Sequence, residues 1–105
     1  MKWYNNLWIG NSILKKKNRI KWRIEHNILC PGIYVITLSS NQKDLFDIIE
    51  AGELLQKAYP KKELFIVGLA NGFTESVELV AAICNNSLME TGGLDIRSYI
   101  MNVEE

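Results

Sequence analysis

The fold of this chain is decided by the stretch Ile33-Tyr34-Val35-Ile36-Thr37-Leu38. It is short, rich in β-branched residues and almost wholly apolar, as a strand that is buried on both faces should be. A second stretch of the same kind, Leu64-Phe65-Ile66-Val67-Gly68-Leu69, follows later in the chain. We therefore expect two central strands, at about residues 33–39 and 64–70.

The segment between these strands has the apolar spacing of a helix, expected over residues 43–59 and stopped by Pro60. Its apolar stripe consists of Leu45, Ile48, Ile49, Leu55 and Tyr59. Two strands joined by a helical crossover of this length are normally parallel, with a right-handed connection. The sequence therefore predicts that strands 33–39 and 64–70 run parallel.

A further helix is expected after the second strand, with Thr74 as its N-cap and Gly92-Gly93 at its end. The residues expected to face the sheet are Val77, Val80, Ala81, Cys84 and Leu88. Residues 94–100 then alternate between apolar and polar, which predicts an edge strand with one wet face. Residues 33–100 are thus expected to form a βαβαβ core.

A basic amphipathic helix is expected over residues 12–29, ahead of this core. Its apolar face consists of Ile13, Ile20, Ile24 and Ile28. Cys30-Pro31-Gly32 should end it, because proline removes a donor and restricts the residue before it. Trp3, Tyr4, Leu7 and Trp8 also fit helical spacing, which leaves a helix open for residues 3–9. We favour an extended aromatic arm or a further strand over residues 1–11, since Asn5-Asn6 and Gly10 are poor helix residues.

Charge is divided unequally along the chain, although the formal net charge is zero. The run from Lys15 to Arg23 carries six of the twelve Lys and Arg residues. Residues 1–30 hold seven basic side chains and one acidic one, whereas residues 31–105 hold five basic and eleven acidic ones. Such a split is typical of a nucleic-acid contact, and equally of two subunits or two parts of one fold that attract each other.

The two cysteines have no CxxC partner, and a single histidine does not complete a usual zinc site with them. The chain lacks a signal-peptide pattern at its start and an apolar run of about 20 residues. We expect a reduced cytoplasmic protein without a membrane contact, a metal or a cofactor.

Three phrases of the sequence resemble those of a small uncharacterised bacterial protein family of about 100 residues, whose function is unknown. They are residues 34–41 (YVITLSSN), 66–72 (IVGLANG) and 91–97 (TGGLDIR). The resemblance implies a small bacterial single-domain protein and carries over no functional residue. With the patterns above, we expect one α/β domain over residues 1–105, with a small parallel or mixed sheet of three to four strands and three helices.

The loops that follow the two central strands form the first candidate site. In parallel sheets, ligands bind beyond the carboxyl ends of the strands, near helix N-termini. The candidate ligand-binding residues there are Ser39, Ser40, Asn41, Asn71, Gly72 and Thr74. They suit a carboxylate or a phosphate, but the same residue types serve as ordinary caps and turns, and neither a P-loop nor a GxGxxG motif is present.

The basic helix provides the second candidate site, a stripe for nucleic acid or an anion. Lys15, Arg19, Trp22 and His26 are spaced by four, three and four residues, which places them on one helix face. A basic stripe with an aromatic residue can bind phosphates and stack on a base. The alternative is that Trp22 packs at the edge of the sheet or in a subunit interface.

Catalysis has little support in the sequence. His26 and Cys30 are four residues apart, but no third group that would orient the imidazole is identifiable. The carboxylates Asp44, Asp47, Glu50 and Glu53 recur every three residues and drift around the expected helix, which favours a solvated face over a metal site.

The sequence therefore favours a non-enzymatic domain that binds a protein partner or forms a symmetric homodimer, burying Trp22 or the segment from Trp3 to Trp8. The first alternative is a domain that binds a small anionic ligand through loops 39–41 and 71–74. The second is nucleic-acid binding through the basic helix, residues 15–26.

Overall fold

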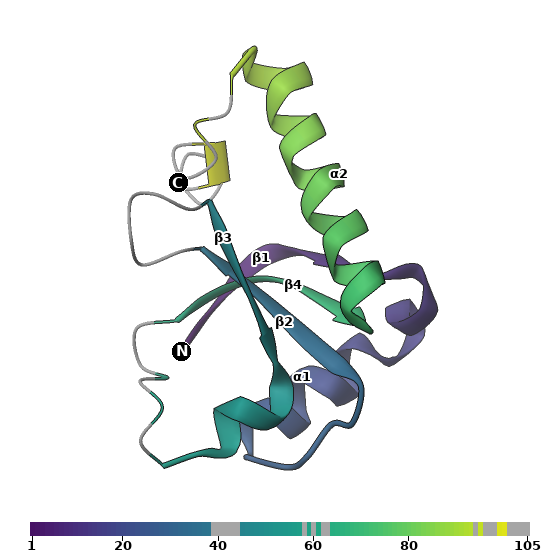
Figure 1. The fold of residues 1–105 in the computed structure, drawn as a ribbon, viewed down its shortest axis with the longest axis vertical. Coiled ribbons are helices and arrows are strands. Elements are labelled where there is room, and N and C mark those ends of the chain that lie inside the picture. Colours follow the sequence, from purple (N-terminus) through teal and green to yellow (C-terminus); the bar gives the residue numbers. More distant parts are fainter. Residues whose placement is uncertain are drawn as a thin grey trace.

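The computed structural model describes residues 1–38, 45–57, 59, 61, 64–93, 95, 99 and 100. Over these residues the chain forms a four-stranded sheet with helices on both faces, which confirms the α/β class (Figure 1). In chain order the elements are β1 (Lys2–Ile9), the 3-10 helix η1 (Asn11–Lys16), α1 (Lys17–Glu25), β2 (Ile33–Leu38), β3 (Phe46–Glu50), the 3-10 helix η2 (Ala51–Leu55), β4 (Phe65–Asn71) and α2 (Phe73–Thr91).

The sheet is mixed, with the strand order β1-β4-β2-β3. β1 is parallel to β4, whereas β2 runs antiparallel to both of its neighbours, β3 and β4. Val35 on β2 pairs with Ile49 on one side and with Leu69 on the other. The two central strands lie where the sequence predicts them, but the prediction that they are parallel is wrong.

The helix expected over residues 43–59 is the source of that error. Its described residues form β3 and η2 instead, so a hairpin replaces the helical crossover. Ile48 pairs with Ile36 across the hairpin. This cross-strand contact between two apolar side chains stabilises the strand form of the segment, and an isolated helix would lack it. Gly52 disfavours a helix interior, and β-branched Ile48 and Ile49 favour a strand, so both local preferences agree with the observed structure.

β1 confirms the extended interpretation of the N-terminal segment, but its pairing with β4 is irregular. Trp3 pairs with Ile66 and Trp8 with Gly68, so the four residues between the tryptophans lie opposite Val67 alone. β1 therefore arches away from the sheet. Gly68 suits this close approach of the two strands, because a Cβ there would lie only 3.0 Å from the carbonyl oxygen of Trp8.

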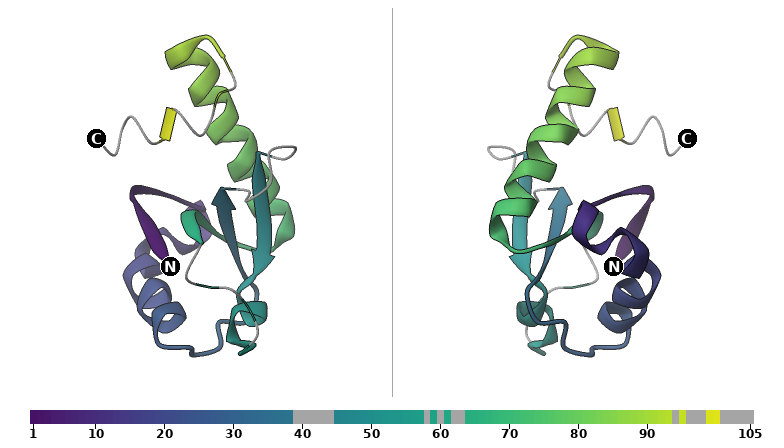
Figure 2. Two further views of the ribbon diagram at one scale, coloured as in Figure 1. Left: turned by 90° about the vertical axis from the view of Figure 1, so that its left-hand side faces the viewer. Right: turned by 90° about the vertical axis from the view of Figure 1, so that its right-hand side faces the viewer.

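The core consists of two apolar clusters, one on each face of the sheet. On the face covered by η1, α1 and η2 the buried residues are Ile13, Ile20, Ile24, Cys30, Ile33, Val35, Ile49, Ala51, Leu54, Ile66 and Leu69. On the face covered by α2 they are Tyr4, Ile36, Leu38, Val67, Ile83 and Ile100. Neighbours such as Val35 and Ile36 belong to different clusters, so α1 and α2 lie on opposite faces of the sheet (Figure 2).

The helix expected over residues 12–29 is divided and ends early. Its first part is the 3-10 helix η1, and α1 ends at Glu25, followed by Asn27 with a positive φ of 57°. Ile13, Ile20 and Ile24 are buried as predicted. Ile28 lies beyond the helix and is exposed, which corrects the fourth position of the predicted stripe.

α2 is confirmed as a helix, and its predicted face is confirmed in part, because Val80 and Cys84 pack against the α2-side cluster. Its fully buried residues are Ser76, Ile83 and Ser87. Val77 and Leu88, both expected to face the sheet, are each 45% exposed. Gly92 ends the helix in the left-handed conformation, as predicted.

The strand expected over residues 94–100 lies mostly outside the described residues. Tyr99 and Ile100 are helical, so the expected strand does not continue there. The backbone N–H of Tyr99 donates to the carbonyl oxygen of Asp95 at 3.0 Å, and Ile100 is fully buried on the α2 side.

Candidate functional site on the basic helix

The positive charge of the chain gathers on η1 and α1. The sequence of these two elements contains six Lys and Arg residues and one acidic residue, Glu25. Because the isoleucines of α1 face the sheet, the basic side chains are left to its two flanks and its outer face. Each flank borders a pocket, and the outer face carries Trp22.

The outer face holds the predicted stripe of Lys15, Arg19, Trp22 and His26, and all four residues are exposed. Lys15 belongs to η1, and the other three lie on α1 or at its C-cap. The rings of Trp22 and His26 are stacked, with centroids 4.1 Å apart. His26 Nδ1 lies 2.8 Å from the carbonyl oxygen of Trp22, so this imidazole is engaged at the end of the helix.

One flank of α1 borders a pocket of about 240 Å³ that we call the arginine pocket. It is lined by Ile13, Lys16, Arg19, Ile20, Arg23, Cys30, Pro31, Ile33 and Asn71. Lys16, Arg19 and Arg23 are spaced by three and four residues, so they lie on one flank of η1 and α1. The side-chain amide of Asn71 comes from the end of β4. Among these described residues the lining includes no Asp or Glu, so the pocket is electropositive.

Asn71 reaches this pocket because Gly32 leaves it room. A Cβ at position 32 would lie 3.1 Å from Asn71 Oδ1, and Gly32 has a positive φ of 78°. The N–H of Gly72 donates to the carbonyl oxygen of Gly32 at 2.8 Å, which ties the end of β4 to the start of β2. The structure thus brings Asn71 and Arg19, from two separate predicted sites, into one pocket.

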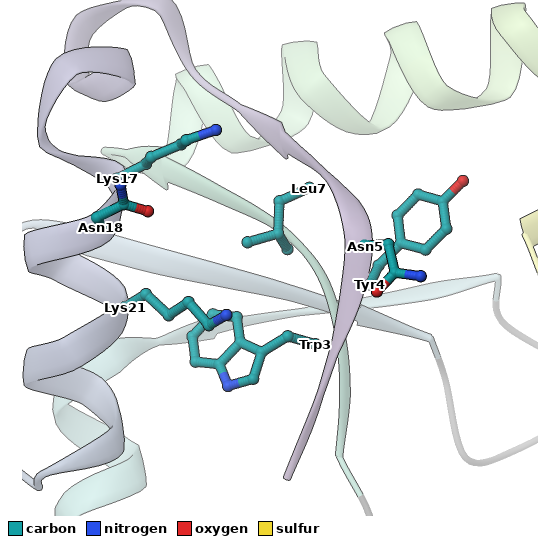
Figure 3. A pocket seen from close by; sticks show the side chains of 7 residues that line it. All are labelled: Trp3, Tyr4, Asn5, Leu7, Lys17, Asn18 and Lys21. Atoms are coloured by element: carbon teal, nitrogen blue, oxygen red, sulfur yellow. The ribbon is translucent and has the colours of Figure 1, made fainter. Parts of the chain in front are cut away.

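The other flank borders a second pocket of about 190 Å³, which we call the lysine pocket (Figure 3). Its residues are Trp3, Tyr4, Asn5, Leu7, Lys17, Asn18 and Lys21. The arch of β1 forms one wall, and α1 forms the other. Lys21 Nζ lies 5.3 Å from the centre of the Trp3 ring, a cation–π distance, so this lysine already has a partner.

α2 on the opposite face of the sheet is acidic. Its sequence contains Glu75, Glu78 and Glu90 and no Lys or Arg. The Glu75 carboxylate accepts hydrogen bonds from the N–H of Asn71 at 2.8 Å and from Ser12 Oγ at 2.9 Å. The Asn71 N–H is the main cause that lowers the pKa of Glu75, so this carboxylate stays ionised.

The predicted strand-end site lies only partly within the described residues. Ser39, Ser40 and Asn41 lie outside the described residues. Leu38, which precedes them, pairs with Phe46, whereas Asn71 pairs with Ile33 at the other end of β2. The argument that both loops share one edge required parallel strands, and β2 and β4 are antiparallel, so this support for the site is lost.

The remaining helix-start residues of that site have separate places. Gly72 is the N-cap of α2, with a φ of 86°. Thr74 is exposed inside the first turn and makes no capping hydrogen bond, which corrects its prediction as the cap. Asn71 is the residue of the predicted set that lines a pocket in the described structure.

The pairing of His26 with Cys30 is not formed. His26 Nδ1 contacts the Trp22 carbonyl, while Cys30 Sγ lies 3.7 Å from the carbonyl oxygen of Ile28. Burial is the main cause that raises the pKa of the Cys30 thiol, so it is a poor nucleophile. No group of three potential metal ligands occurs in the described residues, and Asp47, Glu50 and Glu53 lie on β3 and the 3-10 helix η2 rather than on one continuous α-helix.

No protein-family model, curated protein or solved structure matches this chain. Within the described part of the chain, no helix combines the length and the apolar character needed to cross a bilayer.

Proposed function

We propose that this protein is a non-enzymatic interaction domain that associates with further copies of its own chain. The observation that carries the proposal is the exposure of Trp22, 52% of whose surface is open on the outer face of α1. Trp3 and Trp8 pack against the two core clusters, so Trp22 is the tryptophan best placed for a partner. Exposed tryptophans of this kind are enriched in protein interfaces.

α2 offers a second apolar surface, which we call the α2 seam and define as Val77, Ala81 and Leu88. These residues are spaced by four and seven residues, that is by one and two turns, which places them on one exposed flank of the helix. Met89 beside them is 78% exposed. Contiguous apolar patches on a folded domain usually mark contact sites.

The charges of the two surfaces are complementary, and this favours one mode of association. A symmetric contact between the η1 and α1 segments of two copies would bring six basic residues of each copy together, which is unfavourable. A contact between Trp22 of one copy and the α2 seam of the next pairs a basic helix with an acidic one.

The proposed contact is therefore head-to-tail rather than the symmetric homodimer expected from the sequence. α1 and α2 lie on opposite faces of the sheet, so a reciprocal pair would have difficulty using both surfaces at once. A head-to-tail contact repeats from copy to copy unless its rotation closes a ring. Each copy then carries one donor surface and one acceptor surface.

Analytical ultracentrifugation of three proteins tests this proposal. The wild type should sediment faster as its concentration rises, whereas Trp22→Glu and Leu88→Arg should each remain monomeric. Leu45→Glu is the matched control, because Leu45 is 44% exposed but lies outside α1 and α2. Circular dichroism confirms that each variant is folded, and Val77→Arg replaces Leu88→Arg if the latter is not.

Mixing the two monomeric variants separates the head-to-tail contact from a symmetric one. Trp22→Glu retains an intact α2 seam and Leu88→Arg an intact Trp22, so an equimolar mixture should form a one-to-one dimer. A symmetric interface would give no such complementation. A wild type that stays monomeric at every concentration, or a mixture without dimer, would overturn the proposal.

A second candidate function is nucleic-acid binding through residues 15–26, favoured by the exposed Trp22–His26 stack among basic residues. A fluorescently labelled single-stranded oligonucleotide should then bind with an affinity that falls steeply with salt and falls further in Trp22→Ala. An affinity unaffected by Trp22→Ala would exclude base stacking on this residue.

A further inference from the structure

The arginine pocket gathers positive charge without a counterion from the described protein. Arg19 and Arg23 are four residues apart on α1, and Lys16 precedes Arg19 by three, so their side chains emerge from one flank. None of the three forms an ion pair with a carboxylate within the described residues. Like charges at this spacing repel one another, and a bound anion would relieve that repulsion.

The shape and floor of the pocket indicate what kind of anion fits. Its volume of about 240 Å³ lies just below the usual range for small-molecule sites. The floor is apolar, formed by Ile13, Ile20 and Ile33 with the ring of Pro31. The pocket therefore combines a cationic wall with a small apolar surface, which suits an anionic head group attached to a short organic group.

We propose that the arginine pocket binds the phosphate group of a small phosphomonoester. Arg19 and Arg23 present planar guanidinium groups, which form paired hydrogen bonds with phosphate oxygens, and Lys16 adds a third cation. Three cations match a dianion better than a singly charged carboxylate. The Asn71 amide donates the remaining hydrogen bond from the end of β4, and the apolar floor receives the organic group.

The lysine pocket on the other flank provides an internal control for this assignment. Lys21 belongs to the same helix and carries the same charge as Arg23, but it faces the Trp3 ring. Removing the charge of Lys21 lowers the net charge of α1 by one, as removing the charge of Arg23 does, but it leaves the lining of the arginine pocket unchanged. A diffuse attraction of anions to α1 would respond equally to both changes.

Isothermal titration calorimetry with three probes tests the proposal in a Leu88→Arg background, which keeps self-association out of the measurement. The probes are inorganic phosphate, propyl phosphate and butyrate. Propyl phosphate should bind most tightly, because it combines the dianionic head group with a short apolar chain. Arg23→Gln should weaken its binding about tenfold or more, while Lys21→Gln should change it less than about twofold.

Nuclear magnetic resonance locates the bound probe, and the outcomes are distinct. Propyl phosphate should shift the side-chain amide signals of Asn71 more than those of Asn18 in the lysine pocket. Equal losses in Arg23→Gln and Lys21→Gln would reduce the effect to diffuse attraction and overturn the proposal. Absence of binding at millimolar probe would overturn it too, and so would a single-stranded oligonucleotide that binds through these arginines while propyl phosphate does not.

Discussion

α1 and α2 pack on opposite faces of one sheet, and their apolar patterns relate to their burial in different ways. On α1 the isoleucine stripe that the spacing identifies is the face that the sheet covers. On α2 the sheet covers Ser76, Ile83 and Ser87. Val77 and Leu88, the expected contact residues, are nearly half exposed. Apolar spacing identifies both helices, but it locates the buried face of α2 only in part, because Val80 and Cys84 pack against the core whereas Val77 and Leu88 do not.

The difference follows from the width of the apolar arc. α1 has charged residues on both sides of its isoleucines, so one orientation is clearly preferred. α2 continues its apolar arc well beyond Ile83, and the sheet covers only part of it. Ser76 and Ser87 are buried at little cost, because their hydroxyls donate to the carbonyl oxygens of Phe73 and Gly93.

The largest expected effect tests the orientation of α2. Ile83→Ala should lower the free energy of unfolding by about 2–4 kcal/mol, because it leaves a cavity in the α2-side cluster. Leu88→Ala removes an apolar side chain of the same size from the exposed flank and should cost less than about 1 kcal/mol. Chemical denaturation of both variants decides the matter. Similar losses of stability in the two variants would indicate that Leu88 is buried, as the sequence predicts.

A smaller effect is expected on the α1 side, at the junction that positions Asn71. Gly32→Ala should destabilise the protein by about 1–2 kcal/mol, since alanine resists the positive φ at this position. The added Cβ also crowds Asn71 Oδ1. Gly93→Ala is the matched control, because a Cβ there meets no atom within 4 Å and no positive φ is required. Equal stability of Gly32→Ala and the wild type would contradict the strain.

Glu75 connects the two helical layers, and its effect should depend on pH. Glu75→Gln should cost about 1 kcal/mol near neutral pH, because the ionised carboxylate accepts from Asn71 N–H and Ser12 Oγ. A lowered pKa stabilises the fold above the unfolded carboxyl's pKa of 4.5, and this contribution is lost as the pH falls through the folded pKa. Denaturation at pH 7 and pH 3 should show the difference between wild type and variant shrinking in acid. If the difference in unfolding free energy were the same at both pH values, the charge of Glu75 could not be the cause of the stabilisation.

The smallest effect is expected for the exposed charge of η1. Lys16→Ala should change the free energy of unfolding by less than about 0.5 kcal/mol, because the side chain is exposed and unpaired with any carboxylate among the described residues. Ile36→Ala, which empties a fully buried position, is the contrasting variant and should cost about 2–4 kcal/mol. Denaturant titrations that give equal losses would show that the core is misassigned.

Much of the fold follows from local patterns, whereas the hairpin does not. The apolar stretches at 33–38 and 65–71 become central strands, and Gly92 ends α2 as its conformational freedom suggests. Residues 46–50 satisfy helical and strand spacing alike, so the partner strand decides. β2 lies alongside and offers matching apolar residues. Such a pairing depends on the tertiary structure, so the spacing of residues within one segment does not predict it.

The candidate site was predictable in its parts but not in their assembly. Arg19 and Asn71 each stand out in the sequence, one by its basic stripe and one by its place after a strand. Lys16 and Arg23 were missed as pocket residues, although their spacing from Arg19 places them on a common flank. The pocket exists because β4 runs antiparallel to β2 and returns Asn71 to Ile33, so the sheet topology had to be known first.

The pairing of β1 with β4 has a consequence for the order in which the chain can fold during synthesis. β1 leaves the ribosome first, yet its partner residues are 65–69. The hairpin of β2 and β3 is local and can close as soon as residue 50 has emerged. β1 must wait for β4 with its backbone edge unpaired, and its docking closes a long loop. Of the four strands, β1 is therefore the last to be paired and the one exposed longest to chaperones on the nascent chain.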